Sequence, residues 1–96
     1  MSVYIIAKFT IHDRSEYDIY ESGFAAVFAK FDGKMLSVDE EPMVLSGDWD
    51  ATRSVIIEFP SQKSALTWMS SDEYQAIAKH RNAVCSVTSI LGNGLG

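Results

Sequence analysis

Apolar side chains alternate with polar ones in some segments of the chain and recur every three or four residues in others. In residues 3–11 every odd position is apolar, while the even positions Tyr4, Ile6, Lys8 and Thr10 are mixed. A period of two predicts a strand with one wholly apolar face. Because the other face is half apolar as well, we expect this strand to be covered on both sides.

A helical period follows this strand. Asp13 is expected to cap the first free amides, with Glu16 three residues further on. Apolar side chains then recur at helical spacing over four turns: Tyr17, Tyr20, Phe24, Val27, Phe28 and Phe31. Gly23 within this helix indicates close packing or a small kink. Gly33 is expected to end the helix in the left-handed cap position.

The middle of the chain reads as two or three short strands. Residues 34–38 and 53–59 have strand composition, and residues 43–45 are a possible edge segment after the acidic cluster that ends at Pro42. Residues 47–50 read as a turn. In the strand 53–59, apolar residues occupy one face, and Ser54, Ile56 and Glu58 occupy the other.

The last third of the chain predicts a broken helix and a final strand. Ser61 is expected to cap a helix through Met69, and Ser70 with Glu73 forms a capping box that restarts it. Residues 86–91 read as a strand, and residues 92–96 as a loose tail.

The order of these elements predicts an α+β fold. A β-α-β-β-α-β order with right-handed crossovers gives the ferredoxin-like arrangement, here a single domain over residues 1–96 with a four- to five-stranded antiparallel sheet. The two main helices are expected on one face of the sheet. The other face carries Tyr4, Ile6 and Ile56, which are too apolar for comfortable exposure. A second copy of the chain is the simplest cover, so a homodimer is expected.

Charge and cysteine content narrow the class of protein. The 96-residue chain has a net charge of −5 with scattered lysines and arginines, which disfavours nucleic acids and anionic membranes as partners. The N-terminal apolar run is too short for a signal peptide or a membrane span. A single cysteine, Cys85, excludes an internal disulfide and fits a reducing compartment, so we expect a cytoplasmic protein.

Several segments resemble the DUF1330 family of the dimeric α+β barrel superfamily. The resemblance spans nearly the whole chain and rests on residues 31–36, 45–49 and 53–61, followed by Ala65, Trp68, Ser71, Tyr74 and Arg81. It implies a ferredoxin-like homodimer. The family usually has two glycines where this chain has Asp32 and Gly33. It has no established activity, and its relatives include cofactor-free monooxygenases, haem-degrading enzymes and small isomerases.

Lys8, Glu58 and Arg81 are the candidate catalytic residues. Lys8 and Glu58 fall on the mixed faces of the first and third strands, which we expect to be central, parallel neighbours. Charges there need partners. They are interpreted either as an acid–base pair in the barrel interior or as an ion pair that fixes the register of the dimer. Arg81 continues an apolar helical stripe, so it either reaches Glu58 or a bound anion, or packs its stem on the core with its head in water.

Aromatic side chains suggest a binding cleft between helices and sheet. Tyr20, Trp68 and Tyr74 would line it and offer polar tips to a planar ligand. Tyr4, Arg53 and His80 are further ligand-binding candidates, although His80 is expected to face solvent. The cysteine and histidines match no structural zinc spacing, and no cofactor motif is present, so neither a metal nor a cofactor is expected.

Three interpretations of function stay open. The first is a small dimeric protein that binds a small molecule in this cleft. The second is a cofactor-independent monooxygenase or isomerase. The third is a non-catalytic structural or stress-associated dimer. Catalysis predicts that Glu58 and Arg81 line a hydrated pocket with room for a ligand, and the structural interpretation predicts that they are dry and fully paired.

Overall fold

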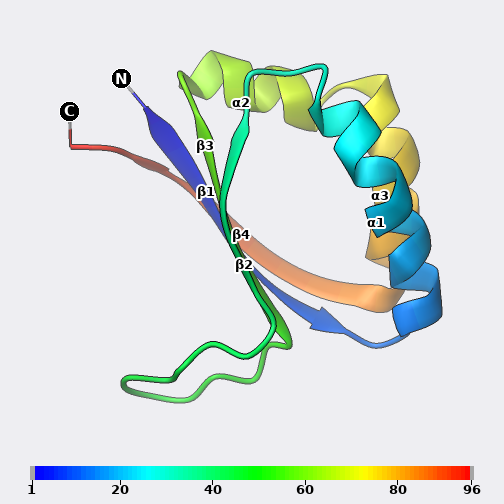
Figure 1. Ribbon diagram of the computed structural model, residues 1–96, viewed down its shortest axis with the longest axis vertical. Coiled ribbons are helices and arrows are strands. Elements are labelled where there is room, and N and C mark those ends of the chain that lie inside the picture. The colour runs from blue at the N-terminus through cyan, green and yellow to red at the C-terminus, as the bar shows by residue number, and fades with distance from the viewer. Residues whose placement is uncertain (1, 96) are drawn as a thin grey trace.

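A computed structural model describes residues 2–95 as a four-stranded sheet with helices on one side (Figure 1). The elements are β1 (Val3–Ile11), α1 (Arg14–Phe28), β2 (Lys34–Asp39), β3 (Arg53–Phe59), α2 (Gln62–Met69), α3 (Asp72–Val84) and β4 (Cys85–Asn93). This is the predicted ferredoxin-like α+β arrangement. The helices share one face of the sheet, as expected, and no helix of residues 2–95 covers the other face.

The strands lie in the order β2-β3-β1-β4, and each neighbouring pair is antiparallel. The expectation that the first and third strands are parallel is therefore wrong. The crossover through α1 gives β1 and β2 the same direction, and the connection after β2 reverses β3. Because β3 lies between β1 and β2, it runs antiparallel to both.

The core follows the predicted alternation. Val3, Ile5, Ala7 and Phe9 of β1 are at most 7% exposed, and the first three of them pair with buried residues of β3. The helices contribute mainly aromatic residues to the same core: Tyr17, Tyr20, Phe28, Trp68 and Tyr74. Gly23 lies where α1 meets α3, and a Cβ built there would be 3.0 Å from Cγ2 of Ile77. The predicted close packing at Gly23 is therefore confirmed.

The end of α1 differs from the expectation for Gly33. The helix ends at Phe28, and backbone hydrogen bonds from Lys30 and Phe31 to residues three positions earlier tighten the last turn. Gly33 does not have a positive φ, so it is not a left-handed cap; within residues 2–95 only Gly47 has one, at 75°. Glycine is needed at position 33 because the rings of Phe28 and Phe59 fill the space that a Cβ would take.

Two caps are as predicted and one is displaced. The side chains of Asp13 and Ser61 accept hydrogen bonds from the backbone amides of Glu16 and Ser64. The break between α2 and α3 is confirmed, but Ser71 rather than Ser70 caps α3, by accepting from the amide of Tyr74. The Ser70 hydroxyl instead donates to a carbonyl of α2.

Both other departures concern segments beyond the sheet core. Residues 43–45 form no strand, so the described sheet has four strands rather than five. Residues 40–52 instead form a loop that extends away from the sheet on the side opposite the helices (Figure 1). The predicted tail begins later than expected, because β4 pairs with β1 as far as Asn93, opposite Val3.

We expect Gly33→Ala to lower the free energy of unfolding by about 1–3 kcal/mol, a typical cost of overpacking a core. A Cβ at this position would lie 2.4 Å from Cζ of Phe28 and 2.7 Å from Cζ of Phe59, so both rings must move. Urea unfolding followed by tryptophan fluorescence measures the loss. Asp32→Ala, an exposed position in the same turn, is the control and should change little. Equal stability of the Gly33→Ala and parent proteins would contradict this packing role.

Candidate functional site

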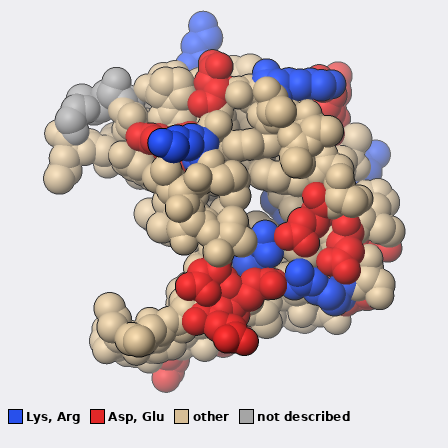
Figure 2. Space-filling view, viewed as in Figure 1, with Lys and Arg blue, Asp and Glu red and all other residues tan. Residues whose placement is uncertain are grey.

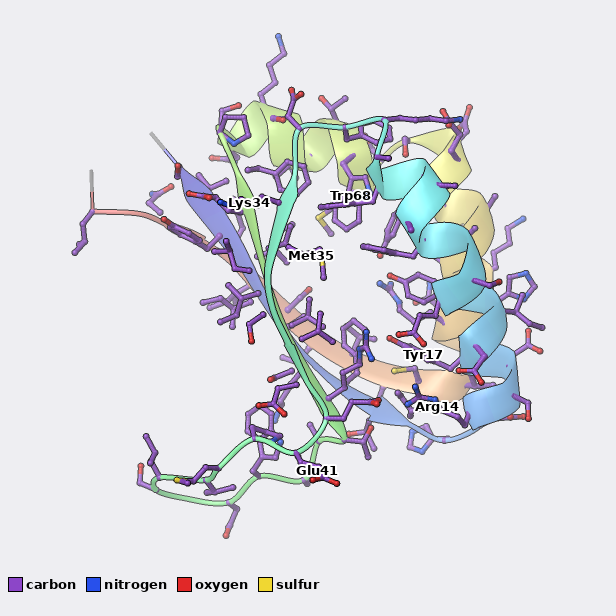
Figure 3. All side chains as sticks on the ribbon, in the orientation of Figure 1. Arg14, Tyr17, Lys34, Met35, Glu41 and Trp68 are labelled. Atoms are coloured by element: carbon purple, nitrogen blue, oxygen red, sulfur yellow. The ribbon has the colours of Figure 1, made fainter. Side chains whose placement is uncertain are left out.

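A cavity of about 430 Å³ lies between the helices and the sheet. Figure 2 shows the hollow, and Figure 3 shows Met35 and Trp68 pointing into the space between the two layers. Its volume falls within the range of small-molecule sites. Most of the wall is apolar, and its polar or amphipathic members are Tyr17, Tyr20, Glu21, Arg53, Trp68, Tyr74, Arg81 and Ser89.

An aromatic cluster around Trp68 forms one end of the cavity. The Trp68 ring centroid lies 4.3 Å from that of Tyr74, 5.4 Å from Phe28 and 5.5 Å from Phe59. The indole is 3% exposed, and its N–H group has no hydrogen-bond acceptor among residues 2–95. A buried donor without a partner is costly.

Arg81 reaches the cavity from α3. Its Nη1 donates to the hydroxyl of Tyr74 at 2.6 Å, and its Nε and Nη2 donate to the side-chain oxygen of Asn82. The guanidinium carbon lies within 6.0 Å of the ring centroids of Phe9, Tyr20 and Tyr74. No carboxylate of residues 2–95 lies within 4.0 Å of this guanidinium. Its positive charge is therefore stabilised by aromatic ring faces and by neutral hydrogen-bond acceptors.

The hydroxyls of Tyr20 and Tyr74 form a hydrogen bond of 3.2 Å. Both rings are about 4% exposed. Burial, together with the neighbouring Tyr74, raises the pKa of Tyr20 well above its ordinary value. Tyr20 is therefore a neutral hydroxyl that can donate a hydrogen bond, and Arg81, Tyr74 and Tyr20 form a connected chain.

Four charged side chains form connected ion pairs at the other end of the cavity. Arg53 of β3 lies 2.9 Å from Glu21 of α1 and 3.5 Å from Glu40, while Arg14 pairs with the same two carboxylates. We call Arg14, Glu21, Glu40 and Arg53 the ion network. The hydrogen bond from Arg14 holds the pKa of Glu40 below its ordinary value and raises that of Arg14. The Arg53 side chain is only 11% exposed, and its Nε has no acceptor among the described residues.

The structure divides the candidate residues into two groups. Five of them line the cavity: Tyr20, Arg53, Trp68, Tyr74 and Arg81. Four do not: Tyr4, Lys8, Glu58 and His80. His80 was expected to face solvent, and its side chain is 41% exposed; its Nδ1 also lies 2.7 Å from a carboxylate oxygen of Glu16, so it links α3 to α1.

Lys8 and Glu58 are not neighbours, so that expectation is wrong. In the antiparallel register Lys8 lies opposite Ser54, and Glu58 lies opposite Tyr4. Both lie on the sheet face without helices, away from Arg81. Tyr4 donates to Glu58 at 3.3 Å, and the Lys8 ammonium lies 3.7 Å from Asp50 in the loop.

The sequence analysis did not identify most of the other lining residues as site residues, among them Tyr17, Glu21 and Met35. Glu21 follows Tyr17 by four residues, so helical spacing places both on one face of α1. That spacing was the available signal. It was not enough, because a carboxylate on an inward face is recognised only when its partner Arg53 is known.

Within residues 2–95 no helix is long and apolar enough to cross a membrane. The same part of the chain contains no group of three or more His, Cys, Asp or Glu side chains placed to hold a metal ion.

Comparison with known proteins identifies the fold and the family. The model of DUF1330, a domain of unknown function, matches residues 2–95. A protein of unknown function from Rhodopseudomonas palustris has a TM-score of 0.84 at 18% identity, with 99% of this chain and 83% of that chain covered. A search of curated protein sequences gave no match.

Two further solved structures have similar folds. SnoaB from Streptomyces nogalater, described as a cofactor-independent oxygenase, has a TM-score of 0.69 at 16% identity, with 99% and 94% of the two chains covered. A protein from Bacteroides fragilis, described as dimeric with a ferredoxin-like fold, has a TM-score of 0.71 at 16% identity, with 97% and 96% covered. At these identities the similarity establishes the fold alone.

Because the pKa of Glu40 is lowered in the folded chain, the free energy of unfolding depends on pH in the acidic range. A carboxyl whose pKa is lower in the folded chain stabilises the fold above its unfolded pKa, and the contribution is lost as pH falls through the folded value. We expect Glu40→Gln to lower the free energy of unfolding at pH 7 by less than about 1 kcal/mol, because the side chain is 41% exposed. This difference should shrink below pH 4.5, the ordinary value for this group.

Urea unfolding at pH 7 and at pH 3 measures this difference. Glu41→Gln is the matched control, since Glu41 is exposed and forms no ion pair with residues 2–95. A Glu40→Gln effect of the same size at both pH values would contradict the assignment to the ion network.

Proposed function

The chain belongs to the DUF1330 family of domains of unknown function, and we propose that it acts as a homodimer that binds a small, largely apolar molecule between its helices and its sheet. The cavity is the observation that carries this proposal. It has the volume of a small-molecule site, a mostly apolar wall and a few polar groups that converge on it.

The sheet face without helices supports the homodimer. Ile56, Ile6 and Ile90 lie side by side across β3, β1 and β4, because Ile6 pairs with both of the others. Ile6 is 45% exposed and Ile90 is 61% exposed. We call these three residues the isoleucine row. A contiguous apolar row on an open sheet face is typical of a surface that a partner covers.

Polar residues flank the isoleucine row on both sides. Tyr4 and Glu58 occupy one side, and Lys8 with Ser54 occupies the other. An apolar centre with a polar rim is the usual composition of a protein interface. The role that we propose for Lys8 and Glu58 is therefore at the rim of the dimer, where they fix its register.

The loop formed by residues 40–52 extends the same face. It carries exposed apolar side chains at Met43, Val44, Leu45 and Trp49. The C-terminal part of this loop contacts the sheet, since Trp49 and Asp50 both lie close to the ammonium of Lys8. Figure 2 shows this loop and the opposite end of the sheet as two projections with a concave surface between them, which suits a second copy. The dimeric description of the Bacteroides fragilis neighbour is consistent with this proposal.

The proposal is limited to binding. SnoaB is described as an oxygenase, but its similarity to this chain is one of fold, and one fold supports many functions. The two charges that were candidates for acid–base chemistry, Lys8 and Glu58, lie outside the cavity.

Ligand binding is tested with N-phenyl-1-naphthylamine, a neutral naphthalene probe whose fluorescence rises in apolar sites. We expect saturable binding with about one probe per chain. Ala7→Leu should weaken it, because Ala7 lines the cavity and the larger side chain takes up part of the space. Ala83→Leu, which changes an exposed position of α3 in the same way, should bind normally. Absence of saturable binding by the parent protein, or equal binding by Ala7→Leu, would contradict the proposal.

The dimer is tested by sedimentation at micromolar concentration, which should give about twice the chain mass of 10.6 kDa. Ile6→Lys should be a monomer, since it would bury an unpaired charge in the interface. Ile19→Lys is the matched control, because Ile19 is 48% exposed on the helical side, and this variant should stay dimeric. A monomeric parent protein, or a dimeric Ile6→Lys variant, would refute this interface.

A further inference from the structure

We propose that the ligand of this cavity is a planar aromatic molecule with an ionised carboxylate, and that Arg81, Tyr74 and Tyr20 bind the carboxylate. The inference rests on the proposed binding function and specifies its chemistry. Three independent features support it: the charge on the cavity wall, the surplus of hydrogen-bond donors, and the shape of the aromatic surface.

The cavity wall has a surplus positive charge in an acidic protein. Two guanidinium groups, Arg53 and Arg81, and one carboxylate, Glu21, line it, so its net charge is +1 in a chain of net charge −5. Glu21 is paired with Arg53 and with Arg14. The charge that lacks a carboxylate among residues 2–95 is therefore that of Arg81. A partly buried cation favours an anion beside it.

The position of Arg81 also indicates a role inside the cavity. It belongs to the last turn of α3, where a cation interacts favourably with the carbonyl end of the helix. Its guanidinium, however, hydrogen-bonds Tyr74, two turns earlier, and lies over the rings of Phe9 and Tyr20. The side chain is thus directed along the cavity wall.

A count of protons at the two tyrosines leaves one donor unused. The Tyr74 oxygen accepts from Arg81, and the two hydroxyls share one hydrogen bond. Each hydroxyl carries one proton, so their single mutual bond uses one proton and leaves the other. No further hydrogen bond of either hydroxyl is formed with residues 2–95, and both rings are buried. The remaining O–H group therefore needs an acceptor, which a carboxylate supplies.

The other unmatched groups are donors as well. Within residues 2–95, the buried side-chain polar atoms without a partner are Nε of Arg53 and Nε1 of Trp68, and both carry N–H groups. Both belong to side chains that line the cavity, and no buried side-chain acceptor of the described residues lacks a partner, which agrees with a ligand that is rich in acceptors. A carboxylate also matches the planar fork of a guanidinium.

The aromatic residues define the rest of the ligand. Tyr74 links the two parts, since its hydroxyl bonds Arg81 and its ring lies 4.3 Å from the Trp68 ring. Arg81 and Trp68 therefore lie at opposite ends of one tyrosine. A flat aromatic body against Trp68 with its carboxylate at Arg81 uses both, and the ring of Phe28, which also lines the cavity, extends the apolar surface.

The test compares two ligands that share a ring system: 2-naphthoate, which is anionic, and 2-acetonaphthone, which is neutral. Displacement of N-phenyl-1-naphthylamine at pH 7.5 gives both affinities. We expect naphthoate to bind about tenfold more tightly or better, as charge-assisted hydrogen bonds allow. In Arg81→Met this preference should disappear, while the affinity for the ketone changes less than about threefold.

Matched variants distinguish the effect of the Arg81 charge on binding from the effects of a changed net charge and of misfolding. Lys79→Met removes one positive charge from an exposed position of α3 and should retain the preference for naphthoate. Tyr74→Phe keeps the ring and Arg81 but removes one hydroxyl, so it should reduce the preference several-fold. This variant, with the comparison of ligands on the parent protein, also decides the question if Arg81→Met does not fold.

The outcomes distinguish this inference from the proposed function. Equal affinities of the parent protein for naphthoate and the ketone, or a preference that survives Arg81→Met, would overturn the carboxylate site while the binding function stands. Failure of the parent protein to bind any of the three molecules would overturn both.

Discussion

The cavity depends on the rigid spacing between the helices and the sheet. At one end, the rings of Phe28, Phe59 and Trp68 from α1, β3 and α2 pack against one another. At the other end, the ion network joins α1 to β3 through Glu21 and Arg53. Aromatic rings do not compress, and Arg53 is too buried to lose its partners cheaply. The middle of the space therefore cannot close by a simple approach of the two layers.

This spacing links stability to binding. Gly33 illustrates the tight end, since the rings of Phe28 and Phe59 leave no room for even one methyl group beside it. Of these two rings, Phe28 also lines the cavity, where it packs against Trp68. The two faces of the sheet thus have separate roles in our proposals. The face under the helices holds the ligand, and the face with the isoleucine row holds a second copy.

The sequence predicted the features that depend on periodicity. Alternation in β1 identified its buried face, and helical spacing identified Tyr17, Tyr20 and Phe28 as core residues of α1. The aromatic and cationic cavity residues Trp68, Tyr74 and Arg81 were also found, because they lie on inward stripes of their helices.

Features that depend on the relative placement of two elements were not predictable in this way. Lys8 and Glu58 appeared adjacent only under the wrong strand direction, and the antiparallel register separates them. The ion-pair partners of Glu21, Glu40 and His80 lie on other parts of the chain, so no local spacing in the sequence reveals these pairs. Gly33 was expected to relieve backbone strain, but what requires glycine there is the approach of two distant rings.

The most direct test of the binding site is a crystal structure of the protein grown with 2-naphthoate. We expect the naphthalene ring between the helices and the sheet, in contact with Trp68 and Tyr74, and the carboxylate within hydrogen-bond distance of Arg81. Helices that close onto the sheet and leave no space for the ring, or naphthoate bound only outside this cavity, would contradict the proposed site.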